Sequence, residues 1–328
     1  MKALSLFSGG LDSSLASKII QKQGIQVEGI CFISPFFNAK KAEIAAHELG
    51  IPLHIIDIST DLIVLLQSPL YGFGKGANPC IDCHILMVKK AGSLMEKIGA
   101  SFLISGEILG QRPKSQNRWA LDIVEGKSGW KDYLLRPLTA KNLPPTLPER
   151  EGWVKREDLL GIKGRTRRVQ LEMARSLGIK SFPTPAGGCL LTDPIFSKKI
   201  KHLLKGGKLS LNEIELLKLG RHFLLKEGVK LIVGRNKIEN TMILQLAIEG
   251  DTCLQAVDYP GPIGLLRKRD AGNEILLLAA SITARYSDAP HARTKVEYFR
   301  LPQKEKQYIE VIPVKDEKLE TLRIGDRQ

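Results

Sequence analysis

The sequence lacks the features that mark a membrane or secreted protein. None of its apolar runs reaches the roughly 18 residues that a membrane-spanning helix needs. The first ten residues contain one basic side chain but no apolar stretch long enough for a signal peptide. Internal repeats and low-complexity tracts are also missing. The 328 residues, 43% hydrophobic and 26% charged, therefore predict a cytoplasmic globular protein with room for two domains and no membrane partner.

The sequence contains few cysteines, and their number is odd. Five cysteines in a cytoplasmic chain argue against a disulfide framework. They are core residues, metal ligands or redox groups, and their spacing has to distinguish these roles. Cys31 and Cys253 have no partner at a useful spacing, and we expect both in the core.

Acidic residues are outnumbered, and the excess of positive charge is uneven. The net charge is +14, of which residues 1–205 carry +11 and residues 206–328 carry +3. Residues 112–180 alone contain 16 basic and 8 acidic side chains. Such a concentration attracts polyanions, most often nucleic acid, with a merely solvated basic surface as the alternative.

The first hundred residues alternate between strand and helix patterns. The expected strands are Ala3–Phe7, Val27–Ile33, Leu53–Asp57 and Ser101–Ser105, and the expected helices are Asp12–Gln23, Ala39–Leu49 and Ile81–Lys97. This alternation predicts an α/β domain, in which helices cover both faces of a parallel sheet and ligands bind at the carboxyl ends of the strands.

The rest of the chain is less regular. Residues 110–160 are interpreted as an elaborated loop region with some short strands, followed by helices at Arg167–Leu177 and Ser197–Leu204. The Gly206-Gly207 pair predicts a boundary between the α/β domain, residues 1–205, and a small α+β domain, residues 206–328. For the latter we expect a helix at Leu211–Leu217 and strands at Leu231–Gly234, Ile243–Ile248, Ile263–Leu266 and Ile275–Ala280.

The turn after the first strand has the composition of a phosphate-binding loop. Its residues, 8–14, are Ser-Gly-Gly-Leu-Asp-Ser-Ser. The two glycines allow a tight turn and close approach to an anion, and the helix that follows directs free N–H groups at it. The serines add hydroxyl donors, and Asp12 can orient Mg²⁺. A plain turn with a helix cap is the alternative for an isolated glycine pair, but the position after the first strand favours phosphate.

This string resembles the signature of the ATP pyrophosphatases, the PP-loop family, and lacks the Gly-Lys-Ser/Thr ending of a Walker A loop. The resemblance implies cleavage of ATP between its α and β phosphates and transfer of AMP to a carbonyl or carboxylate oxygen. It implies Asp12 as a catalytic residue. The ATP-binding residues that it implies are Ser8, Gly9, Gly10, Asp12, Ser13, Ser14, Phe32, Gly106 and Glu107. For Phe32, ordinary burial in its strand is the alternative.

Three cysteines have a spacing suited to sulfur or metal chemistry. Cys80 and Cys83 form a Cys-x-x-Cys pair at the start of an expected helix, which stabilises thiolates, and Cys189 lies in a Gly-Gly-Cys loop. Three thiolates without a fourth suit a [4Fe–4S] cluster with one open iron, since structural zinc usually takes four protein ligands. Zinc completed by His84 and a thioredoxin-like redox pair are the alternatives.

Cys83 and Cys189 also resemble the two cysteines of the tRNA thiolation enzymes within the PP-loop family. Where the cluster-free 2-thiouridylases have an Asp, this chain has Cys80, so the pattern is similar to the cluster-dependent enzymes. The resemblance implies Cys83 and Cys189 as catalytic residues and Cys80, Cys83 and Cys189 as metal ligands, with a persulfide relay between Cys83 and Cys189 as the alternative. The THUMP domain and rhodanese-like extension of the authentic 4-thiouridine synthase have no counterpart in this sequence.

Several arginines are candidates for binding RNA phosphates. They are Arg112, after the second nucleotide loop, Arg165, Arg167 and Arg168, at the start of an expected helix, and Arg221 and Arg235, in the C-terminal domain. A solvated helix face is the alternative for the middle group. The segment around Arg221 and Arg235 resembles the small NFACT-R domain, which implies RNA binding.

These patterns together predict an ATP-dependent tRNA sulfurtransferase that adenylates a uridine carbonyl and replaces its oxygen with sulfur. The expected cofactors are ATP, Mg²⁺ and a [4Fe–4S] cluster. The expected partners are tRNA and a sulfur donor, either external sulfide or a cysteine desulfurase system. The alternatives are a PP-loop ligase that amidates a small molecule or nucleoside, and a non-catalytic tRNA-binding protein.

Overall fold

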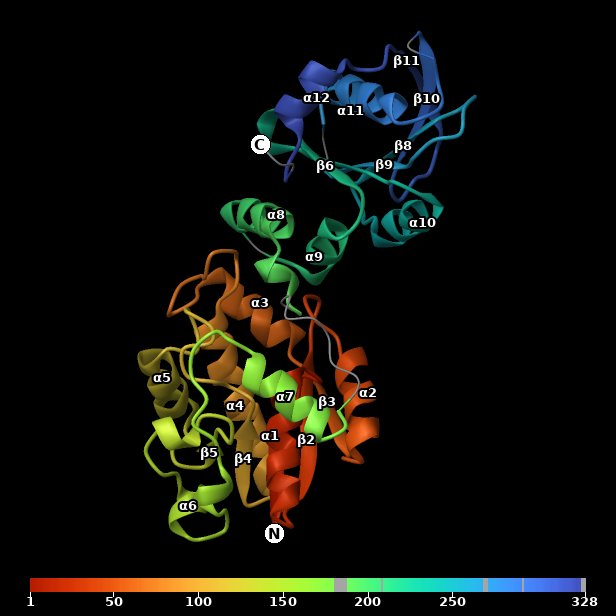
Figure 1. Ribbon diagram of the computed structural model, residues 1–328. Coiled ribbons are helices and arrows are strands. Elements are labelled where there is room, and N and C mark those ends of the chain that lie inside the picture. Colours follow the sequence, from red (N-terminus) through yellow and green to blue (C-terminus); the bar gives the residue numbers. More distant parts are fainter. Residues whose placement is uncertain (180–187, 208, 268–270, 291, 326–328) are drawn as a thin grey trace. The chain divides into compact units, whose positions relative to one another are not determined.

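The computed structural model describes residues 1–328 except 180–187, 208, 268–270, 291 and 326–328 (Figure 1). Its contacts divide the chain into two compact units, Met1–Thr192 and Asp193–Gln328. Helix α8 (Pro194–Lys205), which precedes the Gly206-Gly207 pair, groups with the second unit. The domain boundary at residues 205 and 206 stays a prediction.

The first unit is built on a parallel sheet. Its strands are β1 (Lys2–Leu6), β2 (Gln26–Ile33), β3 (Leu53–Asp57), β4 (Phe102–Ser105) and β5 (Leu134–Leu135), in the order β3-β2-β1-β4-β5. Every adjacent pair is parallel, which confirms the predicted α/β class.

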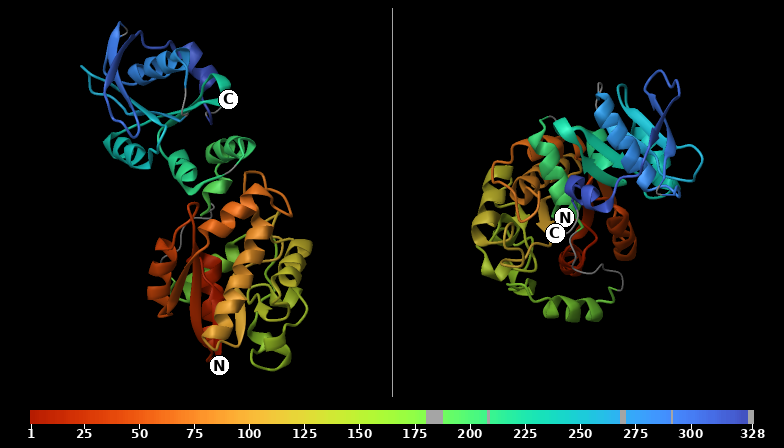
Figure 2. Two further views of the ribbon diagram at one scale, coloured as in Figure 1. Left: turned by 180° about the vertical axis from the view of Figure 1, so that it is seen from behind. Right: turned by 90° about the horizontal axis from the view of Figure 1, so that it is seen from above.

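Helices cover both faces of this sheet. They are α1 (Leu11–Lys22), α2 (Lys40–Leu49), α3 (Ser59–Gln67), α4 (Cys80–Lys97), α5 (Arg118–Ser128), α6 (Leu147–Arg150) and α7 (Arg168–Ser176), with short 3-10 turns η1 (Ala140–Asn142), η2 (Arg156–Asp158) and η3 (Leu190–Thr192). Alternate strand residues point to opposite faces, so Ala3 and Val27 pack with α1, α2 and α7, whereas Leu4 and Ile30 pack with α4 and α5. The reverse view shows α4 in front of the sheet (Figure 2).

Helix α5 lies in the region that the sequence analysis interpreted as loop, and that interpretation was wrong there. The side chain of Asn117 accepts a hydrogen bond from the backbone N–H of Ala120 at 2.9 Å and so caps the helix. The buried residues Ala120, Leu121 and Val124 supply a helical apolar face that the surrounding prolines obscured in the sequence.

The second unit is an antiparallel sheet with helices. Its strands are β6 (Arg221–Leu224), β7 (Lys230–Val233), β8 (Thr252–Ala256), β9 (Gly264–Arg267), β10 (Thr294–Arg300) and β11 (Gln307–Val311), in the order β11-β10-β8-β9-β7-β6. Its helices are α8, α9 (Leu211–Leu217), α10 (Lys237–Leu246), α11 (Asn273–Arg285) and α12 (Asp316–Leu322), with the 3-10 turn η4 (Lys226–Gly228). Helix α11 packs on one face of the sheet, and α9 and α10 pack on the other.

Two of the strands expected in this unit are helical. Ile243–Ile248 overlaps the end of α10, and Ile275–Ala280 lies inside α11. Short apolar runs do not distinguish a buried strand from a buried helix. The N-cap of α10 decides its type, because the Asn236 side chain accepts from the Glu239 N–H at 2.9 Å. Among the described residues no helix is both long and apolar enough to cross a membrane.

Candidate nucleotide site and cysteine cluster

The predicted phosphate loop lies at the carboxyl edge of the sheet. Strand β1 pairs with β4 so that Leu6 is opposite Ser105. The segment Ser8–Ser14, which follows β1, and Gly106, which follows β4, therefore leave the sheet side by side. Gly10 is the N-cap of α1 in an extended conformation, and the N–H groups of the first turn of α1 are free of intrahelical bonds. This is the strand–turn–helix geometry that binds anions.

Two glycines allow the backbone to pack closely around this loop. Gly9 has a φ of +68°, and a Cβ added to it would lie 2.3 Å from the backbone of Lys41. A Cβ on Gly106 would lie 2.5 Å from the carbonyl carbon of Asp12 and 2.5 Å from the nitrogen of Ser13. Both positions therefore require glycine, and Gly106 fixes the second loop against the first turn of α1.

Replacing Gly106 with Ala is expected to weaken ATP binding and to lower the free energy of unfolding by about 1–3 kcal/mol, because the new methyl group displaces the loop. Gly126→Ala is the matched control: that helical glycine has no atom within 4 Å of an added Cβ, and Ala should be neutral or slightly stabilising. Urea unfolding and ATP titration of the two variants measure both effects. Equal ATP affinity in wild type and Gly106→Ala would contradict the assignment.

Asp12 has one oxygen without a protein partner. Its Oδ2 accepts a hydrogen bond from Gln111 Nε2 at 2.8 Å, and its Oδ1 is buried with no hydrogen-bond partner in the described part of the chain. Burial raises the pKa of Asp12. The hydrogen bond from Gln111 and the positive charges of Arg167 and Arg112 lower this pKa, but by less. A buried carboxylate oxygen that no protein donor reaches fits the oxygen ligation that Mg²⁺ requires.

Further buried polar atoms without a partner surround this carboxylate or lie in the same loop. Within the described residues they include Ser14 Oγ, Gln111 Oε1 and Arg167 Nε. Buried polar groups in proteins are nearly always hydrogen-bonded, so a donor, an acceptor and a cation left over beside a glycine loop indicate a polar ligand at this edge of the sheet.

The arginines predicted to bind RNA divide into groups. Arg167 and Arg112 both act on the Asp12 carboxylate, which places them at the phosphate loop. Arg165 and Arg168 are exposed, and Arg168 pairs with Glu172 on its own helix at 2.9 Å.

In the second unit, the Arg221 guanidinium lies 4.4 Å from the ring centroid of Tyr286, and Arg235 pairs with Glu239 at 2.6 Å. Both charges are therefore engaged internally, and RNA binding by these residues stays a prediction.

Glu107 is the centre of a buried charge network. Its Oε2 accepts from Arg136 Nε at 2.9 Å, and its Oε1 bonds to His84 Nδ1 at 2.8 Å. Arg136 is 1% exposed and also pairs with Glu125. Burial opposes the ionisation of Glu107, but Arg136 and His84 prevail and hold its pKa at about 2. Both carboxylate oxygens are thus engaged within the protein, and ATP binding by Glu107 stays a prediction.

Phe32 is buried at 7% exposure and packs in the apolar cluster of α4 beside Ile81. Its contact with adenine stays a prediction. Cys31 and Cys253 are buried in the cores of the first and second units, as predicted.

The three remaining cysteines converge from distant segments. Cys80 and Cys83 occupy the first turn of α4, and Asn78 Nδ2 donates to Cys80 Sγ at 3.0 Å. The segment after Cys189 is held by two backbone bonds, from Leu190 N–H to the Phe36 carbonyl at 3.0 Å and from Ala77 N–H to the Leu191 carbonyl at 3.1 Å. Of the Gly-Gly-Cys loop, Gly188 and Cys189 are described, whereas residues 180–187 before them lie outside the described residues.

The Cys83 thiol is less acidic than its place at a helix start predicted, and the Cys189 thiol is also weakly acidic. Burial raises the pKa of Cys83, and the neighbouring Cys189 and Cys80 raise it further. Burial also raises the pKa of Cys189, to about 11, with Cys80 adding to the effect. Desolvation therefore outweighs the helix dipole at Cys83. Among the described residues, no group of three or more Cys, His, Asp or Glu side chains is placed to hold a metal ion.

His84 is bonded to Glu107 through Nδ1, which leaves Nε2 as the nitrogen that could ligate a metal, so zinc completed by His84 stays a prediction. The same bond connects the cysteine helix to the loop after β4. Neither this contact nor the role of Arg136 was predicted from the sequence. An arginine inside the apolar run Leu134-Leu135-Arg136 was the available signal, since a buried arginine requires an acidic partner.

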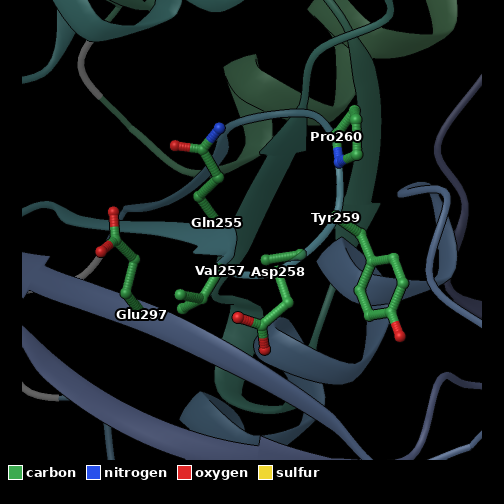
Figure 3. Close-up of a pocket in the computed structure, with 7 residues that line it drawn as sticks. Gln255, Val257, Asp258, Tyr259, Pro260 and Glu297 are labelled. Atoms are coloured by element: carbon green, nitrogen blue, oxygen red, sulfur yellow. The ribbon is translucent and has the colours of Figure 1, made fainter.

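A pocket of about 360 Å³ lies in the second unit and is unsuited to phosphate. It is lined by Gln255, Ala256, Val257, Asp258, Tyr259, Pro260 and Glu297 (Figure 3). The carboxylates of Asp258 and Glu297 repel anions, so the pocket is no rival to the loop after β1 for binding ATP.

Two families match separate parts of the chain. Residues 1–142 match the family described as thiamine biosynthesis protein (ThiI), and residues 220–323 match the NFACT protein RNA binding domain. Among curated proteins, a probable tRNA sulfurtransferase from Lysinibacillus sphaericus is 30% identical over 43% of this chain and 35% of its own length. The tRNA-specific 2-thiouridylase MnmA 2 of Thermoanaerobacter sp. is 28% identical over 60% of this chain and 57% of its own length.

The chain thus spans between about a third and three fifths of the length of these relatives. Among solved structures, a 4-thiouridine synthetase in complex with RNA and ATP is 22% identical, covers 54% of this chain and 40% of its own, and has a TM-score of 0.39. The C-terminal part of a fibronectin/fibrinogen-binding protein from Streptococcus suis has a TM-score of 0.30 at 17% identity, over 80% of this chain and 97% of its own. With TM-scores this low, neither structure adds evidence about the fold beyond the sheet topology described above.

Proposed function

We propose that the protein is an ATP-dependent tRNA sulfurtransferase. Its first segment matches the ThiI family, which belongs to the PP-loop tRNA thiolation enzymes, and its second matches the NFACT RNA-binding domain. It adenylates a uridine carbonyl of tRNA and replaces the oxygen with sulfur. The observation that carries the proposal is the set of unpartnered buried atoms beside the glycine loop, namely Asp12 Oδ1, Ser14 Oγ, Gln111 Oε1 and Arg167 Nε among the described residues.

ATP binding accounts for each of these atoms. The N–H groups of Leu11–Ser13 and the Ser14 hydroxyl donate to phosphate oxygens, and Arg167 and Arg112 neutralise phosphate charge near Asp12. Asp12, together with the phosphates of ATP, would hold Mg²⁺. The bound ion would neutralise negative charge on the leaving pyrophosphate. Arg167, predicted as an RNA contact, is thereby reassigned to the nucleotide.

The chemistry divides into two displacements. The uridine carbonyl oxygen attacks the α phosphorus of ATP, a P–O bond forms, and pyrophosphate leaves with the electron pair of the bond that breaks. Hydrosulfide then attacks the base carbon that carries this oxygen. A C–S bond forms, the C–O bond breaks, and AMP leaves with the oxygen. Neither step changes an oxidation state. The loop amides and Arg167 stabilise charge that develops on the transferring phosphoryl group.

We propose that Cys80, Cys83 and Cys189 hold a [4Fe–4S] cluster, which supplies a binding site for the incoming sulfide. The number of cysteines favours this over a persulfide relay between Cys83 and Cys189, because Cys80 also acts on both of them and a relay leaves it without a role. The proposal requires the thiols to move into ligating positions, since none of the described residues already form a metal-binding group.

The test of the function is formation of thiolated nucleoside from unmodified tRNA, ATP and sulfide under anaerobic conditions, measured by mass spectrometry. Wild type should release AMP and pyrophosphate in step with product. Cys189→Ala should lose the product by a factor of about 10² or more while binding tRNA normally. In a parallel reaction with ammonium in place of sulfide, product that carries nitrogen would favour the amidating ligase.

Iron and sulfide analysis tests the cluster separately. The anaerobically purified protein should contain about four irons per chain, and Cys189→Ala should contain few. A protein without iron or sulfide that still thiolates tRNA would overturn the cluster and direct attention to persulfide on Cys83 or Cys189.

A further inference from the structure

An aromatic pair, of which Trp119 is exposed and Tyr71 is half-buried, stands beside the cysteine helix. Trp119, in the first turn of α5, is 56% exposed, and its ring meets that of Tyr71 edge to face, with centroids 5.9 Å apart and planes at 75°. The other two tryptophans are used internally: Trp130 packs on Gly92 and Tyr133, and Trp153 packs on Phe102. Trp119 is thus the tryptophan whose indole surface is available to a ligand.

The pair is held rigidly at its position. Asn117 caps α5 and also donates through Nδ2 to the Pro113 carbonyl at 2.7 Å, which fixes the turn that carries Trp119. The backbone N–H of Tyr71 donates to the Asp82 carboxylate at 3.2 Å, and that of Leu70 does so at 2.9 Å. Asp82 is buried between the two cysteines of the Cys-x-x-Cys pair, so Tyr71 is attached directly to the cysteine helix.

The same segment reaches the nucleotide site. Residues 111–119 contain three basic side chains and no acidic one. Gln111 donates to Asp12 at 2.8 Å, and Lys114 Nζ donates to the Tyr71 carbonyl at 2.8 Å. Arg112 acts electrostatically on both Asp12 and Cys189. One short basic stretch therefore connects the phosphate loop, the cysteines and the aromatic pair.

We propose that Tyr71 and Trp119 form a stacking platform for an unpaired base of the tRNA, beside the base that is modified. An exposed, fixed aromatic face flanked by cations is an arrangement that binds single-stranded nucleotides. The aromatic ring stacks on the base, and lysine and arginine bind the phosphates of the backbone. The apolar area is too small, and its surroundings are too uniformly basic, to favour a protein as the partner. The inference rests on the proposed function, for it takes the substrate to be tRNA.

The experiment measures tRNA binding and salt dependence in three variants of the full chain. Trp119→Ala should bind unmodified tRNA about 5- to 100-fold more weakly, since stacking on an aromatic side chain contributes that range per base. Its plot of log affinity against log salt should keep the wild-type slope, because no phosphate contact is lost. Trp119→Phe should recover most of the affinity. Ile44→Ala, at an equally exposed apolar position on α2, should bind as wild type does.

A merely structural role for Trp119 is distinguished by ATP affinity, which should be equal in wild type and Trp119→Ala. Wild-type tRNA affinity in Trp119→Ala, or a shallower salt slope, would overturn the platform. Failure of the proposed function has a different signature: wild type would bind tRNA but form no thiolated nucleoside, while the effect of Trp119→Ala on binding would remain. A wild type that binds no tRNA would overturn both.

Discussion

Asp12→Asn is expected to reduce thiolated product by a factor of about 10² to 10³ and, at the same time, to leave the protein at least as stable as wild type. The amide retains an oxygen that can accept from Gln111 but loses the charge that Mg²⁺ and the reaction require. Burial raises the pKa of Asp12, so the folded protein binds a proton there more readily than the unfolded chain does.

The ionised carboxylate therefore costs stability at neutral pH. This cost is absent below the unfolded pKa of about 3.8 and grows as the pH rises through the higher folded pKa. Asn removes it. Thermal unfolding at pH 7 should give a Tm equal to or above that of wild type. Asp57→Asn is the control of opposite sign, because Ser59 hydrogen bonds lower the pKa of Asp57 and Asn should lose stability there. A Tm well below wild type for Asp12→Asn would show that the carboxylate is structural.

Glu107→Gln is expected to lower the free energy of unfolding by about 3–5 kcal/mol, because it leaves Arg136 buried with part of its charge uncompensated. Urea unfolding at pH 7 measures this loss. The double variant Glu107→Gln with Arg136→Met should recover part of the stability, since it removes the stranded cation.

The acid behaviour of this network follows from its depressed pKa. Arg136 and His84 hold the pKa of Glu107 at about 2 in the folded protein, against 4.5 as its ordinary value. The stabilisation is fully present above about pH 4.5 and is lost as the pH falls towards 2. Glu107→Gln should therefore lose less stability than wild type over this interval. Parallel acid titrations of the two proteins would contradict the network.

The nucleotide loop could be predicted from sequence because every determinant of it is local. Strand β1, the glycine pair and the start of α1 occupy consecutive residues, and Gly9 and Gly10 at that point limit the alternatives. The parallel sheet could be predicted for the same reason, since each strand and helix has its own clear period. Local signals failed at Ile275–Ala280, where a short apolar run fits a strand and a helix equally well.

The parts that could not be predicted depend on contacts between distant residues. Arg167 stands 155 positions from Asp12 in the sequence, and only the packing of α7 on α1 brings its charge to the phosphate loop. The pairs of Glu107 with Arg136 and with His84 likewise join separate elements. A basic residue at a helix start suits RNA phosphate and ATP phosphate equally, so its partner is decided by the fold.

The low acidity of Cys83 and Cys189, which are both half-buried, also determines how they withstand air. Oxidants react with the thiolate, and with a pKa of about 11 only about one Cys189 side chain in ten thousand carries that form at pH 7. Cys83, whose pKa is also raised by burial, is protected in the same way. The metal-free protein should therefore keep these two sulfurs reduced through ordinary aerobic handling and remain competent for later loading with iron and sulfide.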